Sequence, residues 1–230
     1  MLALKKFLFK GGSAAHLPDD LRAALDAWRE QPAPALDEVH FHTRYIVLDI
    51  SSSGLNPASD KLLSIAASAV QQATILPADA VFIDCAGLAS DAAATIETTA
   101  GPRVDRKLMA FLQYVAKAPI VTYHIPYVGG FLQRTFKERL GIDFQPQWVD
   151  LAWLLPSLFE EKERNVMPLD YWIETFGLDS GGGRRSAMEN TLMLARIFQM
   201  LLVRANGKDI DTAAQLIEES RASRRLRRSH

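Results

Sequence analysis

The segment that most constrains the fold is Tyr45–Ile50, with the sequence YIVLDI. It is apolar almost throughout and rich in β-branched residues. A strand with one face in water alternates apolar and polar residues, whereas a continuous apolar run predicts a strand covered on both faces. The segment therefore predicts an α/β sheet covered by helices.

The segments that follow extend this prediction. A turn at Gly54–Pro57 leads to a second strand over 62–70, and a third strand is expected over 80–85. Their short connections predict an antiparallel meander. An amphipathic pattern then predicts a helix over 104–117, and a short apolar run predicts a buried strand over 119–123.

Helical periodicity dominates the rest of the chain. It predicts helices that end at Gly141, lie near 150–159 and 168–176, and extend over 186–204 and 208–220. A length of 230 residues allows one large domain or one and a half. We expect an N-terminal helical extension over 1–43, a main domain over 44–205, and a C-terminal helix with a basic tail over 206–230.

Composition excludes several classes of protein. Lys and Arg number 26 against 27 Asp and Glu, a formal net charge of -1, so the whole chain has no general attraction to nucleic acid or acidic membranes. Cys85 is the only cysteine, which excludes an intramolecular disulfide and a zinc site built from cysteines. No targeting or membrane-spanning segment is visible. We expect a cytoplasmic protein with no membrane partner.

The sequence from Tyr45, YIVLDISSSGLNPASDKLLSIAASAV, resembles the first motif of the DnaQ-like 3′–5′ exonucleases of the His-type DEDD subgroup. That motif is a strand ending in Asp-x-Glu, followed by Thr-Thr-Gly-Leu. Asp49 matches the Asp, and Ser51 takes the place of the Glu. The remaining four positions carry Ser52, Ser53, Gly54 and Leu55. The resemblance covers roughly 44–205. It implies a ribonuclease H-like fold, a mixed sheet of three antiparallel strands followed by parallel strands and flanked by helices.

The Asp-x-Glu pair has a simple chemical purpose. Residues at i and i+2 of a strand project from the same face, so two carboxylates there hold two Mg²⁺ or Mn²⁺ ions against a phosphate. In this chain the second carboxylate is replaced by the uncharged hydroxyl of Ser51.

The family's other two motifs also depart from their usual residues. The second resembles His-Asn-x-x-Phe-Asp-x-x-Phe-Leu, and alignment around His124 places its metal-binding Asp on Val128 or, shifted by one residue, on Gly129. In the third, Arg185 takes the position of the His that serves as general base, and Asn190 that of the Asp ligand. A guanidinium does not accept a proton at neutral pH.

Of the five family positions, Asp49 alone is retained. Two divalent ions need several negative charges around them, so we expect no resident metal. Other carboxylates offer weak substitutes: Glu189 is turned away along its helix, Asp150 is interpreted as structural, and Asp143 and Asp179 lack motif support. Arg185 has two interpretations, either pairing with Asp49 across the former metal site or extending into solvent.

The resemblance therefore implies an exonuclease homologue with impaired catalysis that acts by binding. Its partners would be single-stranded DNA or RNA, held near the Ser52–Leu55 segment and His124, or a protein such as a polymerase or another nucleic-acid enzyme. The alternative is an active proofreading or RNA-trimming exonuclease with an atypical ligand set and Mg²⁺ or Mn²⁺. A purely structural subunit is the third possibility.

Two further patterns have competing interpretations. Five arginines lie within eight positions over 221–228, either to contact phosphates or as a solvated tail. Trp148, Trp153 and Trp172 lie among leucines and prolines, which favours core packing over a stacking platform for bases.

Overall fold

The computed structural model describes residues 17–85, 100–178 and 185–228. Its centre is a five-stranded sheet in the order β3-β2-β1-β4-β5. The strands are β1 (Tyr45–Ser52), β2 (Leu62–Gln71), β3 (Thr74–Asp84), β4 (Ile120–Thr122) and β5 (Trp148–Asp150). The first three pair antiparallel, whereas β4 lies parallel to β1 and β5 parallel to β4. The predicted mixed sheet flanked by helices is confirmed.

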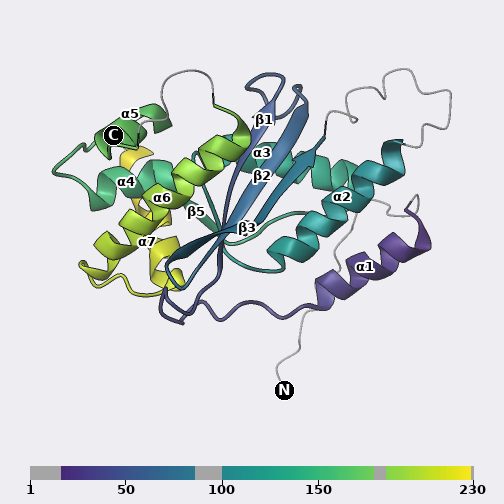
Figure 1. The fold of residues 1–230 in the computed structure, drawn as a ribbon, viewed down its shortest axis with the longest axis horizontal. Helices are drawn as coiled ribbons and strands as arrows, with labels where there is room; N and C mark the ends of the chain where they lie inside the picture. Colours follow the sequence, from purple (N-terminus) through teal and green to yellow (C-terminus); the bar gives the residue numbers. More distant parts are fainter. Residues whose placement is uncertain (1–16, 86–99, 179–184, 229–230) are drawn as a thin grey trace.

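Helices cover both faces of this sheet (Figure 1). They are α1 (Asp19–Glu30), α2 (Ala100–Val115), α3 (Ile125–Leu140), α4 (Leu151–Leu158), α5 (Leu169–Thr175), α6 (Ala187–Asn206) and α7 (Ala213–Arg228). Alternate residues of β1 pack against the helices on opposite faces of the sheet. Ile46, Leu48 and Ile50 pack into a core with α1, α2 and α3. Tyr45 and Val47 pack into a second core with α4, α5, α6 and α7.

This alternation determines where the family's first motif points. Successive strand residues face opposite sides of a sheet, so Asp49 and Ser51 lie on the same side as Tyr45 and Val47. That side is covered by α6, which packs against both β1 and β2. Asp49 therefore faces α6, the helix that carries Asn190.

Some elements differ from the sequence-based expectation. β5 was not expected as a strand, because Val149 is its one β-branched residue and Asp150 ends the apolar run. The last helix extends to Arg228, so the arginine run is helical rather than an irregular tail. In the N-terminal extension, Leu21 and Leu25 of α1 are buried in the first core. The three domain boundaries remain predictions.

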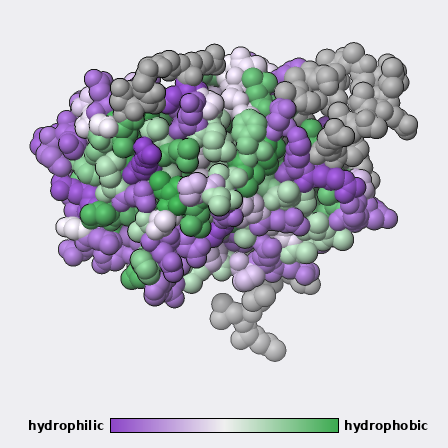
Figure 2. All heavy atoms as spheres, in the orientation of Figure 1, coloured by the Kyte–Doolittle hydropathy of each residue, from purple (hydrophilic) through white to green (hydrophobic). Residues whose placement is uncertain are grey.

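Two expectations lie outside this description. Asp179 and the glycine run 181–183 fall in the part of the chain that the structure does not describe. Among the helices that it does describe, none combines the length and the apolar character that a membrane crossing requires. Polar and apolar residues are interspersed over the face drawn in Figure 2, with apolar residues gathered near its centre.

Candidate functional site

Asp49 lies in the middle of the sheet, opposite the start of α6. Its side chain is partly buried, and its Oδ2 accepts a hydrogen bond of 2.9 Å from Nδ2 of Asn190. Strand and helix thus bring together two residues that are 141 positions apart in the chain. The positions that correspond to the family's first and third motifs therefore meet at one site.

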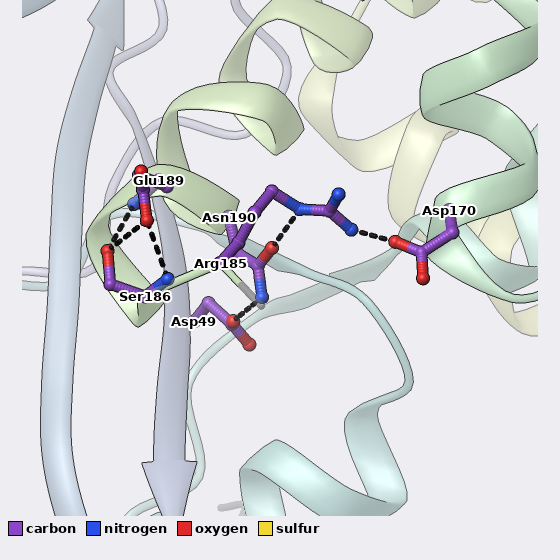
Figure 3. A network of polar contacts seen from close by, with 6 residues as sticks. All are labelled: Asp49, Asp170, Arg185, Ser186, Glu189 and Asn190. Carbon is purple, nitrogen blue, oxygen red and sulfur yellow. Dashed lines mark hydrogen bonds and ion pairs between the residues drawn. The ribbon is translucent and has the colours of Figure 1, made fainter. Parts of the chain in front are cut away.

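Arg185 continues the contact away from Asp49 (Figure 3). Its Nε donates a hydrogen bond of 2.9 Å to Oδ1 of Asn190, and its guanidinium forms an ion pair with Asp170 of α5. The Arg185 side chain is 18% exposed. The interpretation that it extends into solvent is therefore wrong, and its link to Asp49 runs through Asn190. We call Asp49, Asn190, Arg185 and Asp170 the Asp49 network.

The network fixes the orientation of the Asn190 amide. A guanidinium can only donate hydrogen bonds, so Asn190 must turn its oxygen toward Arg185 and its NH₂ group toward Asp49. Asp49 Oδ2 then serves as an acceptor. The amide oxygen of Asn190 is consequently occupied by a cationic side chain.

The first turn of α6 holds these residues in place. Ser186 and Glu189 form a reciprocal capping box: Ser186 Oγ accepts from the Glu189 backbone N–H at 3.2 Å, and Glu189 Oε2 accepts from the Ser186 backbone N–H at 2.7 Å. The Ser186 backbone N–H and the Ser186 hydroxyl, which donates to Glu189 Oε2 at 2.8 Å, lower the pKa of Glu189. Glu189 is thus committed to the helix start and is directed away from Asp49 (Figure 3).

Burial dominates the electrostatics of Asp49. Desolvation raises the pKa of this carboxyl group, and the Asn190 hydrogen bond opposes that rise without cancelling it. The donor of that bond is a neutral amide, which adds no positive charge beside the carboxylate. The charge on Asp49 is therefore only weakly compensated by its neighbours.

The remaining family positions carry no further anionic group. Ser51 Oγ shares a hydrogen bond of 2.6 Å with Ser64 Oγ of the neighbouring strand β2. Val128 is fully buried in the first core, and Gly129 has no side chain. Neither position can ligate a cation through a side chain.

Asp150 has a different set of partners. Its carboxylate accepts from the backbone N–H groups of His124 at 2.8 Å, Ile125 at 3.0 Å and Ala152 at 3.1 Å. It thereby stabilises the start of α3, where His124 has a φ of 65°, and caps α4. These bonds support the interpretation that Asp150 is structural.

The residues expected to contact single-stranded nucleic acid lie around the turn after β1 and the start of α3. Ser52 Oγ shares a hydrogen bond of 2.7 Å with the hydroxyl of Tyr127, whereas His124 is exposed. Leu55 is 84% exposed. A Cβ at Gly54 would lie 2.4 Å from Asp60 Oδ2, so any other residue there would displace the Asp60 side chain.

Ser53 is tied to the same turn. Its backbone N–H donates to the carbonyl oxygen of Lys61 at 2.9 Å, and its Oγ accepts from the Lys61 backbone N–H at 2.9 Å. The turn is therefore held by main-chain pairing while its apex stays in solvent.

The donor set does not fit two divalent cations. Around Asn190, the Asp49 network offers the carboxylate of Asp49, an amide oxygen already bonded to Arg185, and a guanidinium that would repel cations. Among the described residues, no group of three or more His, Cys, Asp or Glu side chains is arranged to hold a metal ion.

Sequence reasoning missed three contributors to this site. Asp170 lies in the first turn of a short helix, and nothing in its spacing indicates a contact with Arg185. Ser64 and Tyr127 partner the first-motif serines. Ser64 alone had a usable signal, because an antiparallel hairpin from β1 to β2 places it opposite Ser51.

Comparison with known proteins defines the fold. The chain has a DnaQ-like 3′–5′ exonuclease fold, a form of the ribonuclease H-like fold. In the solved structures it resembles Escherichia coli exonuclease I in complex with a dA16 oligonucleotide, with a TM-score of 0.52 and 13% identity over 77% of this chain and 42% of that one. It also matches Brucella melitensis NrnC, with a TM-score of 0.46 and 16% identity over 82% of this chain and 88% of that one.

In sequence, the chain is 24% identical to a PolC-type DNA polymerase III from Thermotoga petrophila over 160 residues. The match covers 67% of this chain and 11% of the polymerase. The chain thus spans about a tenth of that polymerase and less than half of exonuclease I. No protein-family model matches the chain.

Proposed function

We propose that this protein binds single-stranded nucleic acid at the Asp49 network and has lost metal-dependent 3′–5′ cleavage. The observation that carries the proposal is the bond from Asn190 to Asp49, with Arg185 holding the other end of the same amide. The neighbours of Asp49 in this network are thus an amide and a guanidinium, rather than a cluster of further carboxylates.

Charge explains why this arrangement opposes cleavage. A pair of divalent ions carries four positive charges, and Asp49 supplies one negative charge. Arg185 adds a fixed positive charge behind Asn190, and a guanidinium cannot serve as the general base that activates water. The charges of the network therefore disfavour both the metals and the proton transfer.

The same surroundings suit binding. Leu55 is 84% exposed in the turn that follows β1, and the exposed His124 lies at the start of α3. A base unstacked from a strand gains from contact with such apolar or ring side chains. The similarity in fold to exonuclease I, whose structure was solved in complex with a dA16 oligonucleotide, supports single-stranded nucleic acid as the ligand.

Two assays on the purified protein test this proposal. Labelled single-stranded DNA and RNA, incubated with Mg²⁺ or Mn²⁺, are expected to keep their full length, and fluorescence anisotropy is expected to show salt-dependent binding. Shortening from the 3′ end that is lost in Asp49→Ala would contradict the proposal and establish the alternative, an active exonuclease with an atypical ligand set. Intact oligonucleotides without any binding would also contradict it and favour a protein partner, such as a polymerase.

A further inference from the structure

A pocket of about 520 Å³ opens beside β5, at the edge of the sheet. Its walls come from the first half of α3, the segment 144–148 that leads into β5, and Arg221 of α7. No member of the Asp49 network is among the residues that line it. Since pockets for small ligands measure roughly 300–1,000 Å³, this one has the size of a ligand site.

Side-chain amides supply much of the polar lining. Gln133 and Gln145 each donate a hydrogen bond of 2.9 Å from Nε2 to Asp143, one to each carboxylate oxygen. Asp143 thereby fixes the orientation of both amides, and each glutamine keeps its carbonyl oxygen and a second N–H for other partners. The pocket thus presents hydrogen-bond acceptors and donors together.

Arg221 and Gln147 also line the pocket. Arg221 Nη2 donates to Gln147 Oε1 at 3.2 Å, and Arg221 Nη1 pairs with Glu218 at 2.7 Å. The bond to Arg221 engages the Gln147 oxygen and leaves the NH₂ group of this amide for a ligand. Because the Arg221 side chain is 49% exposed, its guanidinium remains accessible to an anion.

An aromatic ring and a glycine shape the remaining wall. Trp148 is partly exposed and contacts Phe144 edge to face. A Cβ at Gly129 would lie 3.4 Å from Trp148 Cζ2 and 3.3 Å from Ile125 Cγ2. Glycine inside a helix is unfavourable by about 1 kcal/mol relative to alanine, so its presence here keeps space open beside the indole ring.

Positive charge continues from the pocket along α7. Arg225 follows Arg221 by four positions, which places both on one side of the helix, and Arg224 lies between them in sequence. Asp143 and Glu218 are acidic, but the first is bonded to the two glutamines and the second to Arg221. Arg224 and Arg225 therefore continue the positive charge of Arg221 along α7.

We propose that this pocket binds one nucleotide, with the base among the glutamine amides beside Trp148 and a phosphate at Arg221. Amide side chains pair with the hydrogen-bonding edges of bases, aromatic rings stack on their faces, and arginine binds phosphate. The nucleotide is either free or part of a strand that continues along α7. The inference is independent of the Asp49 network.

Binding of a fluorescein-labelled oligonucleotide, with 5′-AMP as competitor, tests the pocket. Arg221→Ala and Gln147→Leu are each expected to weaken binding about tenfold, and Arg221→Ala to lower the salt dependence by about one phosphate contact. Gly129→Leu fills the pocket without removing a polar group and is expected to weaken binding similarly. Arg196→Ala, an exposed arginine on α6 outside the pocket, is the matched control.

The outcomes separate this inference from the proposed function. Loss of binding in the pocket variants, with Arg196→Ala unaffected, supports the pocket. Competition by 5′-AMP then shows that the pocket binds a free nucleotide. If 5′-AMP does not compete, the pocket binds a nucleotide only as part of a nucleic-acid strand. Unchanged binding in folded pocket variants overturns the inference and leaves the proposed function standing. The same holds if Asp49→Asn is the one variant that weakens binding. No binding by the wild-type protein overturns both.

Discussion

Asp49 and Asp150 are two acids near the carboxyl ends of β1 and β5, and burial raises the pKa of each. Asp150 is 1% exposed and accepts three hydrogen bonds from backbone N–H groups. Asp49 is partly exposed and accepts from one side chain, Asn190. Asp150 therefore stabilises the main chain of two helices, whereas Asp49 stabilises little beyond its own network. An acid that contributes so little to the fold is the better candidate for function.

Replacing each acid with asparagine tests this contrast, and Asp150→Asn is expected to have the largest effect on stability. Asp150→Asn replaces one acceptor oxygen with an NH₂ group that faces a backbone N–H, so we expect the free energy of unfolding to fall by about 2 kcal/mol. Asp49→Asn keeps an oxygen for Asn190 and removes a desolvated charge, so we expect a change within about 1 kcal/mol, of either sign. Urea denaturation at neutral pH measures both, and equal losses would remove the contrast.

Arg185 tests whether the Asp49 network has a structural role of its own. Arg185→Met removes the hydrogen bond to Asn190 and the ion pair with Asp170, whose side chain is 76% exposed. Because an exposed partner weakens the pair, we expect a loss of about 1 kcal/mol. The control is Arg204→Met, which removes a comparable pairing with Glu161 and the Leu158 carbonyl on α4. A loss as large as that of Asp150→Asn would make the network a structural element.

These contrasts show which features the sequence could reveal. The apolar run in β1 and the helical periodicity over 186–204 are local patterns, so they predict the sheet centre and the helix that meet at Asp49. The Asp170 contact depends on how α5 packs beside α6, which no local pattern encodes. β5 was missed for a related reason: pairing with β4, rather than its own three residues, makes it a strand.

The pH dependence of stability offers a smaller test of the same contrast. The folded-state pKa of Asp49 lies above its ordinary value of 3.8, so the charged form is disfavoured in the folded protein. The stability that protonation confers is fully present below pH 3.8 and is lost as the pH rises through the folded pKa. Relative to Asp49→Asn, the wild-type protein should therefore gain stability on acidification toward that value. Unfolding curves across this range check the sign, and a flat difference would contradict it.

Leu55 gives the smallest expected effect on stability and the clearest separation of fold from function. Its side chain is 84% exposed at the apex of a turn whose main chain is held by the pairing of Ser53 with Lys61. Leu55→Ser removes no buried surface, so the free energy of unfolding should stay within about 0.5 kcal/mol of wild type. If a base rests on Leu55, oligonucleotide binding should weaken several-fold, since such contacts contribute about 1–3 kcal/mol each. Ala58→Ser, an exposed position in the same turn, is the matched control. Equal binding by both variants would remove Leu55 from the proposed interface, because the turn itself would be intact in each.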